Sequence, residues 1–134
     1  MDTSMSDCLA IGFSDEFLNT IRFKTDVFPL KDEYGVLLIG EDGTVECGVQ
    51  KAETVICPGR INLPFVIGCN RVITCGMCPS DTLSFSCIDG DRAVLALTRT
   101  VGKAFPGEVG VRYRKELTLY ENLVYHALRL INIR

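Results

Sequence analysis

The stretch Leu-Ser-Phe-Ser-Cys-Ile-Asp-Gly-Asp-Arg-Ala-Val-Leu-Ala-Leu, residues 83–97, decides the fold class. Leu83, Phe85 and Cys87 alternate with serines before Asp89-Gly90, which is the spacing of a strand with one buried face, and the apolar run at 93–97 follows the turn. Asp-Gly supplies the positive φ angles that a tight hairpin turn needs. The stretch therefore predicts an antiparallel β-hairpin and indicates a β-rich domain.

The same reasoning predicts a second hairpin upstream. Residues 35–40 read Gly-Val-Leu-Leu-Ile-Gly, Asp42-Gly43 follows, and Thr-Val-Glu-Cys at 44–47 resumes an extended pattern. Short apolar segments separated by turn residues are typical of an antiparallel β domain. We therefore expect an all-β or mainly β fold.

A further strand is predicted from Val109 onward. Apolar residues at Val109, Val111 and Tyr113 alternate with Arg112 and Arg114, and the alternation extends to 119. This pattern gives one apolar face and one charged face. The basic run that ends at Lys115 then has two interpretations, a solvated strand face or a phosphate-binding patch.

Two segments have helical spacing instead. Ser14 is a good N-cap before residues 15–21, so a short N-terminal helix is predicted there. Apolar residues from Tyr120 to Ile131 recur at helical intervals without Gly or Pro, which predicts a C-terminal helix as the alternative to terminal strands.

Length and composition indicate one domain over residues 1–134, with 1–30 as a partly helical N-terminal extension. The chain has 134 residues, of which 47% are hydrophobic, enough for one core. No window reaches the roughly 18 apolar residues of a membrane helix, and residues 1–20 lack the pattern of a signal peptide. We therefore expect a soluble protein in the cytoplasm or nucleus, without membrane contact.

The charge balance bears on the partners. Fourteen Lys and Arg stand against 17 Asp and Glu, giving a net charge of -3. A chain of this charge presents no general electropositive surface, so binding to nucleic acid is disfavoured.

Seven cysteines occur, an odd number without an export signal, which favours reduced thiols over a disulfide framework. Cys75 and Cys78 have the spacing of a metal or redox pair. A zinc site needs further ligands, and the single histidine, His126, is far away in the sequence. The main interpretation is two unligated cysteines beside a turn, with a zinc or redox site as the alternative.

The sequence shows no clear set of catalytic residues. A Ser or Cys nucleophile needs a base, and His126 lies in an apolar segment where a structural role is expected. Asp81, Asp89 and Asp91 surround the central hairpin and are candidates for a hard cation, but Asp residues also form turns. No glycine-rich phosphate loop follows a strand. We therefore expect no cofactor and favour a protein without catalytic activity.

Four stretches in order resemble landmarks of the trimeric dUTPase family. They are Thr54–Gly59, Leu63–Gly68, Phe105–Val111 and Leu117–Glu121. The resemblance implies an antiparallel β-sandwich or jelly-roll of dUTPase type and a homotrimer. The apolar region 117–133 fits such a subunit contact, and it fits an internal helix equally well.

The departures from the family bear on function. The family's water-orienting aspartate is Gly102 here, and hydrogen cannot replace a carboxylate in positioning a base. Asp89 and Asp91 place negative charge where the family binds phosphate, and the Gly-rich C-terminal arm of the family is not found before Arg134. The resemblance thus implies a scaffold without dUTPase chemistry, similar to viral dUTPase-related proteins that act through protein contacts in the host cell.

The function expected from the sequence is therefore protein–protein interaction by a viral accessory or host-interacting protein. Candidate binding residues lie on loops, hairpin tips and the last strand, namely Phe105, Arg112, Arg114, Asp89 and Asp91. Two alternatives stay open. One is a divergent nucleotide hydrolase using Asp89, Asp91 or Glu108, and the other is a β-rich structural or assembly protein.

Overall fold

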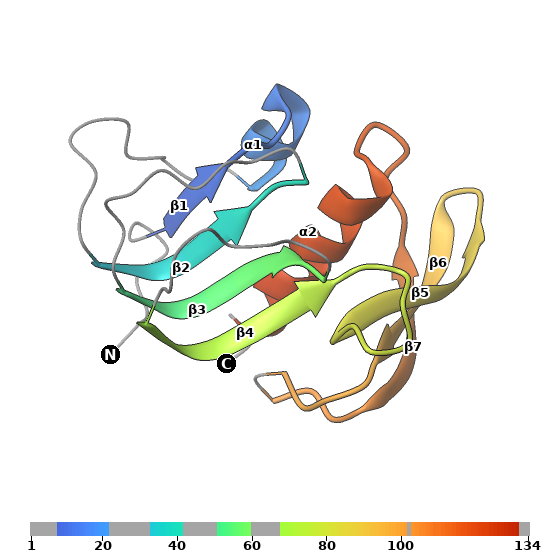
Figure 1. Ribbon diagram of the computed structural model, residues 1–134. Coiled ribbons are helices and arrows are strands. Elements are labelled where there is room, and N and C mark those ends of the chain that lie inside the picture. Colours follow the sequence, from blue (N-terminus) through green and yellow to red (C-terminus); the bar gives the residue numbers. More distant parts are fainter. Residues whose placement is uncertain (1–7, 22–32, 42–50, 60–67, 102, 132–134) are drawn as a thin grey trace.

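The computed structural model describes residues 8–21, 33–41, 51–59, 68–101 and 103–131. Within these ranges, the chain forms a sheet whose strand order follows the sequence from β1 to β7, accompanied by helices α1 and α2 (Figure 1). The strands are β1 (Cys8–Ile11), β2 (Glu33–Ile39), β3 (Lys51–Pro58), β4 (Gly68–Cys75), β5 (Leu83–Asp89), β6 (Arg92–Leu97) and β7 (Gly107–Arg112). The helices are α1 (Asp15–Ile21) and α2 (Leu119–Ile131).

The first half of the sheet is parallel. β1 pairs with β2, β2 with β3 and β3 with β4, all in the parallel sense. Val36–Ile39 in β2 and Thr54–Cys57 in β3 are buried without alternation, as expected for parallel strands that are covered on both faces. The prediction of a wholly antiparallel sheet is therefore wrong for this half.

The expected hairpin at 35–47 is also wrong for β2. One edge of β2 pairs with β1 and the other with β3, both in the parallel sense, so neither edge is left for an antiparallel partner across Asp42-Gly43. The expected return strand at 44–47 lies outside the described residues. The apolar run Val-Leu-Leu-Ile belongs to a strand that is buried on both faces, which is why it does not alternate.

The second half of the sheet is antiparallel. β5 pairs with β6 and β6 with β7 in the antiparallel sense, which confirms the hairpin predicted for residues 83–97. Gly90 has a φ of 65° in the turn, the left-handed conformation that glycine adopts at no steric cost. A single residue pair, Cys75 and Leu83, joins the two halves of the sheet through β4 and β5.

Both predicted helices are confirmed. The hydroxyl of Ser14 accepts a hydrogen bond from the N–H of Phe17 at 3.2 Å, so Ser14 caps α1. At α2, the N–H of Glu121 donates to the Thr118 hydroxyl and the N–H of Thr118 donates to the Glu121 carboxylate, each at 3.1 Å. This reciprocal pair is a capping box. The strand predicted from Val109 therefore ends at Arg112, and Leu119 begins a helix.

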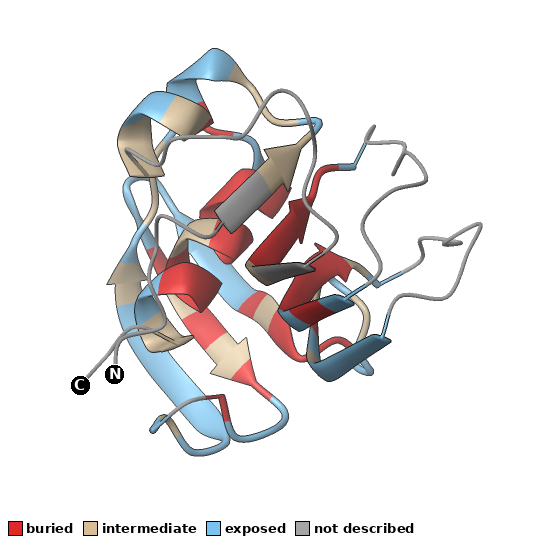
Figure 2. Cartoon of the chain, turned by 90° about the vertical axis from the view of Figure 1, so that its left-hand side faces the viewer, coloured by how far each residue is buried: buried red, intermediate tan, exposed pale blue. Residues whose placement is uncertain are grey.

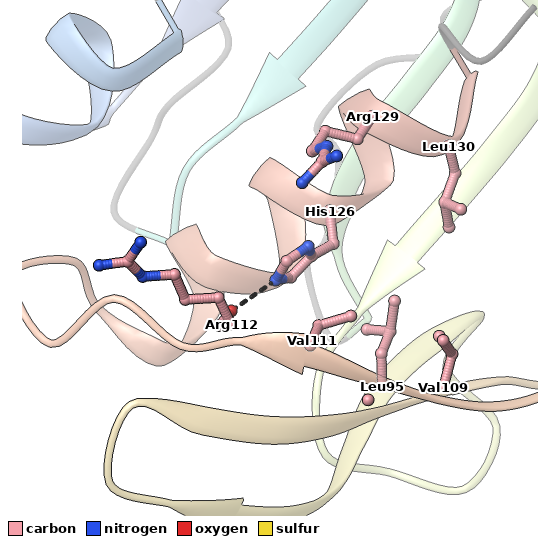
Figure 3. Close-up of a pocket in the computed structure, with 8 residues that line it drawn as sticks. Leu95, Val109, Val111, Arg112, His126, Arg129 and Leu130 are labelled. Atoms are coloured by element: carbon pink, nitrogen blue, oxygen red, sulfur yellow. Dashed lines mark hydrogen bonds between the residues drawn. The ribbon is translucent and has the colours of Figure 1, made fainter.

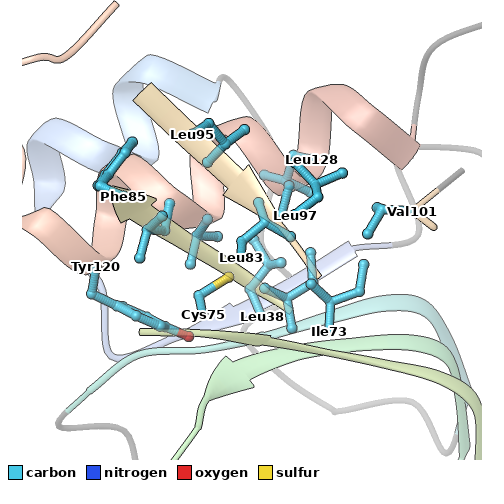
Figure 4. Close-up of a cluster of buried hydrophobic side chains, with 14 of the residues drawn as sticks. Leu38, Ile73, Cys75, Leu83, Phe85, Leu95, Leu97, Val101, Tyr120 and Leu128 are labelled. Carbon is cyan, nitrogen blue, oxygen red and sulfur yellow. The ribbon is translucent and has the colours of Figure 1, made fainter. Parts of the chain in front are cut away.

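Helix α2 packs against β3, β4 and β5, and the core lies between them (Figures 2 and 4). Leu83, Leu123 and Val124 are fully buried, and Leu128 is 3% exposed within the same cluster. The apolar side of α2 is therefore an internal face, which is one of the two interpretations left open for residues 117–133. Removing such a face from water contributes roughly 25 cal/mol per Å² of apolar area.

Within the described ranges, the coarse fold class is confirmed as mainly β with the helices α1 and α2. None of the helices in the described ranges is long and apolar enough to cross a bilayer.

Candidate edge-strand groove

The feature that stands out is the free edge of β7. β7 is the last strand in the sheet order and pairs with β6 alone among the described strands. The N–H of Tyr113 donates to the carbonyl of Asp91 at 2.7 Å. In an antiparallel ladder the hydrogen-bonded pairs recur every second residue, so Val111 and Val109 also direct their backbone groups to β6.

The residues between them therefore direct their backbone groups outward. These residues are Glu108, Gly110 and Arg112. The carbonyl oxygen of Arg112 bears this out, because it lies 3.0 Å from Nε2 of His126 on α2. The outward N–H and C=O groups of Glu108 and Gly110 remain available to another strand, since both residues are exposed.

A pocket of about 410 Å³ lies between β7 and α2 (Figure 3). Its lining is mostly apolar at the sheet, where Leu95, Val109 and Val111 contribute, and Leu130 adds an apolar side chain from the helix. Leu95 is 1% exposed, whereas Val109 is 51% exposed. One wall of this pocket is thus the strand whose backbone edge is free, and the other is α2. We call the pocket and this edge together the β7–α2 groove.

His126 holds one end of the groove. It is buried at 6% exposure, and its Nε2 atom approaches the Arg112 carbonyl. Burial lowers the pKa of His126 below its usual 6.5, the hydrogen bond to Arg112 opposes this, and nearby Arg129 and Arg114 lower it further. The neutral imidazole therefore donates from Nε2–H to the Arg112 carbonyl.

Arginines surround this end of the groove. Arg129 lines the pocket from α2, and its guanidinium carbon lies 6.0 Å from the centre of the Tyr125 ring. The guanidinium carbon of Arg114 lies 5.1 Å from the same ring, within the range of cation–π attraction. The polar groups that α2 contributes to the groove are the neutral His126 and the cationic Arg129, and none of the described lining residues is a carboxylate.

The structure brings two of the predicted binding residues together. Arg112 and Asp91 line one pocket of about 350 Å³ with Arg92. Asp89 lines an adjacent pocket of about 180 Å³ that also includes Gly110. Asp89 and Asp91 are both exposed, and they lie at the tip of the β5–β6 hairpin, beside the end of β7.

The other two predicted residues lie on either side of β7. Phe105 is 80% exposed just before the strand begins. Arg114 follows the strand, where its guanidinium lies over the Tyr125 ring. A guanidinium nitrogen of Arg114 lies 3.8 Å from a carboxylate oxygen of Glu116. The five candidates therefore surround β7 without converging on one point.

The metal alternatives receive no geometric support within the described residues. Cys75 is buried in the core, and the backbone N–H of Cys78 donates to the Asp81 carboxylate at 3.0 Å. No group of three or more His, Cys, Asp or Glu side chains in the described ranges is arranged to hold a metal. Asp81 precedes β5 and Asp89 ends it, so the length of that strand, about 20 Å, separates them.

The buried thiols of Cys57 and Cys75 are poor nucleophiles. Burial, together with neighbouring Cys69 and Asp81, raises the pKa of Cys57 to about 11. Burial also raises the pKa of Cys75, with smaller contributions from Cys57 and Asp81. Both groups are therefore protonated thiols at neutral pH.

Sequence reasoning missed the helix side of the groove. It treated His126 as a structural residue, which its buried hydrogen bond bears out, but it did not place Arg129 or Leu130 at a binding surface. It also expected Val109 to be on a buried face. Gly102, which the resemblance to dUTPases aligns with the family's aspartate, lies outside the described residues.

No protein-family model, curated protein or solved structure matches this chain.

Proposed function

We propose that this protein is a non-catalytic protein-binding domain that captures an extended segment of a partner as an additional strand along β7. One observation carries the proposal: the outward backbone groups of Glu108 and Gly110 lie beside the pocket between β7 and α2. In strand addition, main-chain hydrogen bonds supply affinity and pockets for alternate side chains supply specificity.

The exposed side chains near this edge support the same function. Phe105 and Val109 are large apolar groups with 80% and 51% exposure, and they lie before and within β7. Aromatic anchors contribute strongly to protein interfaces. An exposed edge strand is otherwise a liability that proteins blunt with charge or proline, and here Pro106 and Glu108 provide only partial protection.

The proposal keeps the interaction role expected from the sequence, whereas the dUTPase-like jelly-roll and the trimer stay predictions. The parallel pairing of β1 to β4 does not favour the antiparallel sandwich that the resemblance implies. Light scattering on the reduced protein tests the trimer. Pyrophosphate release from dUTP with Mg²⁺ tests the hydrolase alternative, for which the exposed Asp89 and Asp91 provide no enclosed site.

The decisive variant is Gly110→Pro. The N–H of Gly110 points away from β6, so proline removes the hydrogen-bond donor of the edge without breaking the ladder to β6. Gly110→Ala is the matched control, because a Cβ at this position meets no atom within 4 Å and the N–H is kept.

The experiment selects short random peptides on the wild-type protein and measures their affinity for both variants by fluorescence anisotropy. We expect Gly110→Ala to bind like the wild type and Gly110→Pro to bind about tenfold more weakly, since one lost hydrogen bond costs on the order of 1.4 kcal/mol. Selection of no peptide, or equal affinity for Gly110→Pro, would contradict the proposal. Circular dichroism verifies that both variants are folded.

A further inference from the structure

The two faces of β7 differ in chemistry. Side chains alternate along a strand, so Val109 and Val111 lie on one face and Gly110 and Arg112 on the other. Val109 pairs with Leu95, which is buried, and both line the pocket beneath α2. A strand added along β7 continues this alternation, because neighbouring strands in a sheet keep their pleats aligned.

The opposite face carries two arginines side by side. Arg92 on β6 is the direct cross-strand partner of Arg112 on β7. Like charges at such a position repel each other. Both residues are exposed, and the ion pair recorded within 4 Å among the described residues joins Arg114 to Glu116 instead.

Asp91 lines the same pocket as the two arginines without forming an ion pair within 4 Å of either of them. Arg112 is therefore an exposed cation at the edge of the sheet, with a second cation beside it on β6 and a pocket of about 350 Å³ next to both. A carboxylate placed beside Arg112 would relieve the repulsion, and guanidinium groups suit carboxylates because they donate several hydrogen bonds in a fixed geometry.

We propose that the segment bound along β7 carries apolar side chains beside Val109 and Val111 and an acidic side chain beside Arg112. This inference rests on the proposed function and specifies its ligand. The meander from β5 to β7 is antiparallel, and a strand added in the same sense has the order acidic, apolar, any residue, apolar from its N-terminus. Its acidic residue is the first one beside β7, because His126 already binds the outward carbonyl of Arg112 and α2 closes the groove there. The apolar side chains enter the pocket beneath α2, and the carboxylate lies on the arginine face.

Charge complementarity supports this occupant on both sides of β7. Arg129 lines the pocket on the helix side, where Arg112 contributes its carbonyl, and the guanidinium of Arg112 lies on the arginine face (Figure 3). Pocket-lining groups on the helix side include no carboxylate. Two arginines and one aspartate line the pocket on the arginine face, so an acidic side chain beside Arg112 meets a net positive charge there, although the whole chain has a net charge of -3.

The test uses three labelled synthetic peptides and fluorescence anisotropy. The reference peptide is Thr-Glu-Ile-Thr-Ile-Thr, the second has Gln in place of Glu, and the third has Ser in place of both Ile residues. Against wild-type protein we expect the second and third peptides to bind about tenfold more weakly than the reference. Added salt should weaken the reference peptide and leave the Gln peptide nearly unchanged, because screening acts on the charge pair.

The variant Arg112→Gln tests whether Arg112 causes the preference for the Glu peptide over the Gln peptide. With this variant, we expect the Glu and Gln peptides to bind equally. Arg99→Gln is the matched control, since Arg99 is exposed after the opposite end of β6 and should leave the tenfold preference intact.

Failure of the acidic specificity and failure of strand addition give different results. Equal binding of the Glu and Gln peptides to the wild type, or a preference that persists in Arg112→Gln, overturns the acidic specificity. So does a reference peptide that does not bind at all. In each case the comparison of Gly110→Pro with Gly110→Ala, made with library-selected peptides, decides separately whether strand addition itself stands.

Discussion

The Nε2 atom of His126 lies 3.0 Å from the carbonyl oxygen of Arg112, which joins helix α2 to the outer edge of β7. This hydrogen bond uses one of the outward backbone groups of the edge strand and leaves those of Glu108 and Gly110 for a partner. The helix therefore closes one end of the β7–α2 groove while its last turn, with Arg129 and Leu130, forms the wall of the pocket.

The first prediction concerns the pH dependence of stability. The pKa of His126 is lowered in the folded chain by burial and by Arg129 and Arg114, so the unfolded chain binds the proton more readily. The stability contributed by neutral His126 is present above pH 6.5 and is lost as the pH falls through the folded-state pKa. Urea unfolding should therefore give a lower free energy at acidic pH.

His126→Gln is the control for that prediction, because glutamine can donate to the Arg112 carbonyl but does not titrate. His126 is the single histidine in the sequence, so the difference in pH dependence between the two proteins isolates its contribution. Identical pH profiles would show that His126 does not titrate differently on unfolding.

The second prediction concerns Asn122, which is fully buried. Its side-chain oxygen accepts from the N–H of Arg114 at 2.8 Å, and its amide donates to the carbonyls of Arg114 and Thr118 at 2.9 and 3.0 Å. Asn122→Ala leaves the N–H of Arg114 without a partner, whereas the carbonyls of Arg114 and Thr118 still accept from the backbone N–H groups of residues 117 and 122. The variant should therefore lower the free energy of unfolding by about 1 to 3 kcal/mol. Chemical denaturation measures this loss.

The matched control is Asn19→Ala on the exposed side of α1, where a change within about 0.5 kcal/mol is expected. A loss at Asn122 no larger than the loss at Asn19 would show that the connection from β7 to α2 does not depend on this side chain.

The third prediction separates stability from binding at Phe105. This side chain is 80% exposed, so Phe105→Ala should change the free energy of unfolding by less than about 0.5 kcal/mol. If Phe105 contacts the partner beside β7, the same variant should weaken binding of the selected peptides several-fold. Unchanged peptide affinity would remove Phe105 from the binding surface and leave the groove as the site.

The fourth prediction concerns thiol reactivity. Cys57 and Cys75 are buried and their pKa values are raised, whereas Cys69 and Cys87 are exposed. A thiol reagent at neutral pH should modify Cys69 and Cys87 first and reach the buried pair only after denaturation. Peptide mass spectrometry assigns each site, and rapid modification of Cys57 or Cys75 in the folded protein would contradict the expected protection.

Short sequence signals predicted one hairpin and the start of one helix correctly, and a further helix signal was missed. Asp89-Gly90 and the alternation around it predicted the hairpin from β5 to β6, and Ser14 predicted the start of α1. The pair Thr118 and Glu121 also carries the signature of a capping box, and it would have settled the choice between helix and strand for residues 120–131.

The sequence by itself determined the elements whose causes are local: a turn that needs glycine, a capped helix and an alternating strand. Tertiary structure decided the direction in which β1 to β4 pair, because an apolar run such as Val36–Ile39 buries both faces whichever way its neighbours run. It also decided that β7 is an edge strand. Val109 alternates as a buried residue would, and it is exposed because no further described strand or helix covers it, a property of the whole sheet that no short stretch of sequence encodes.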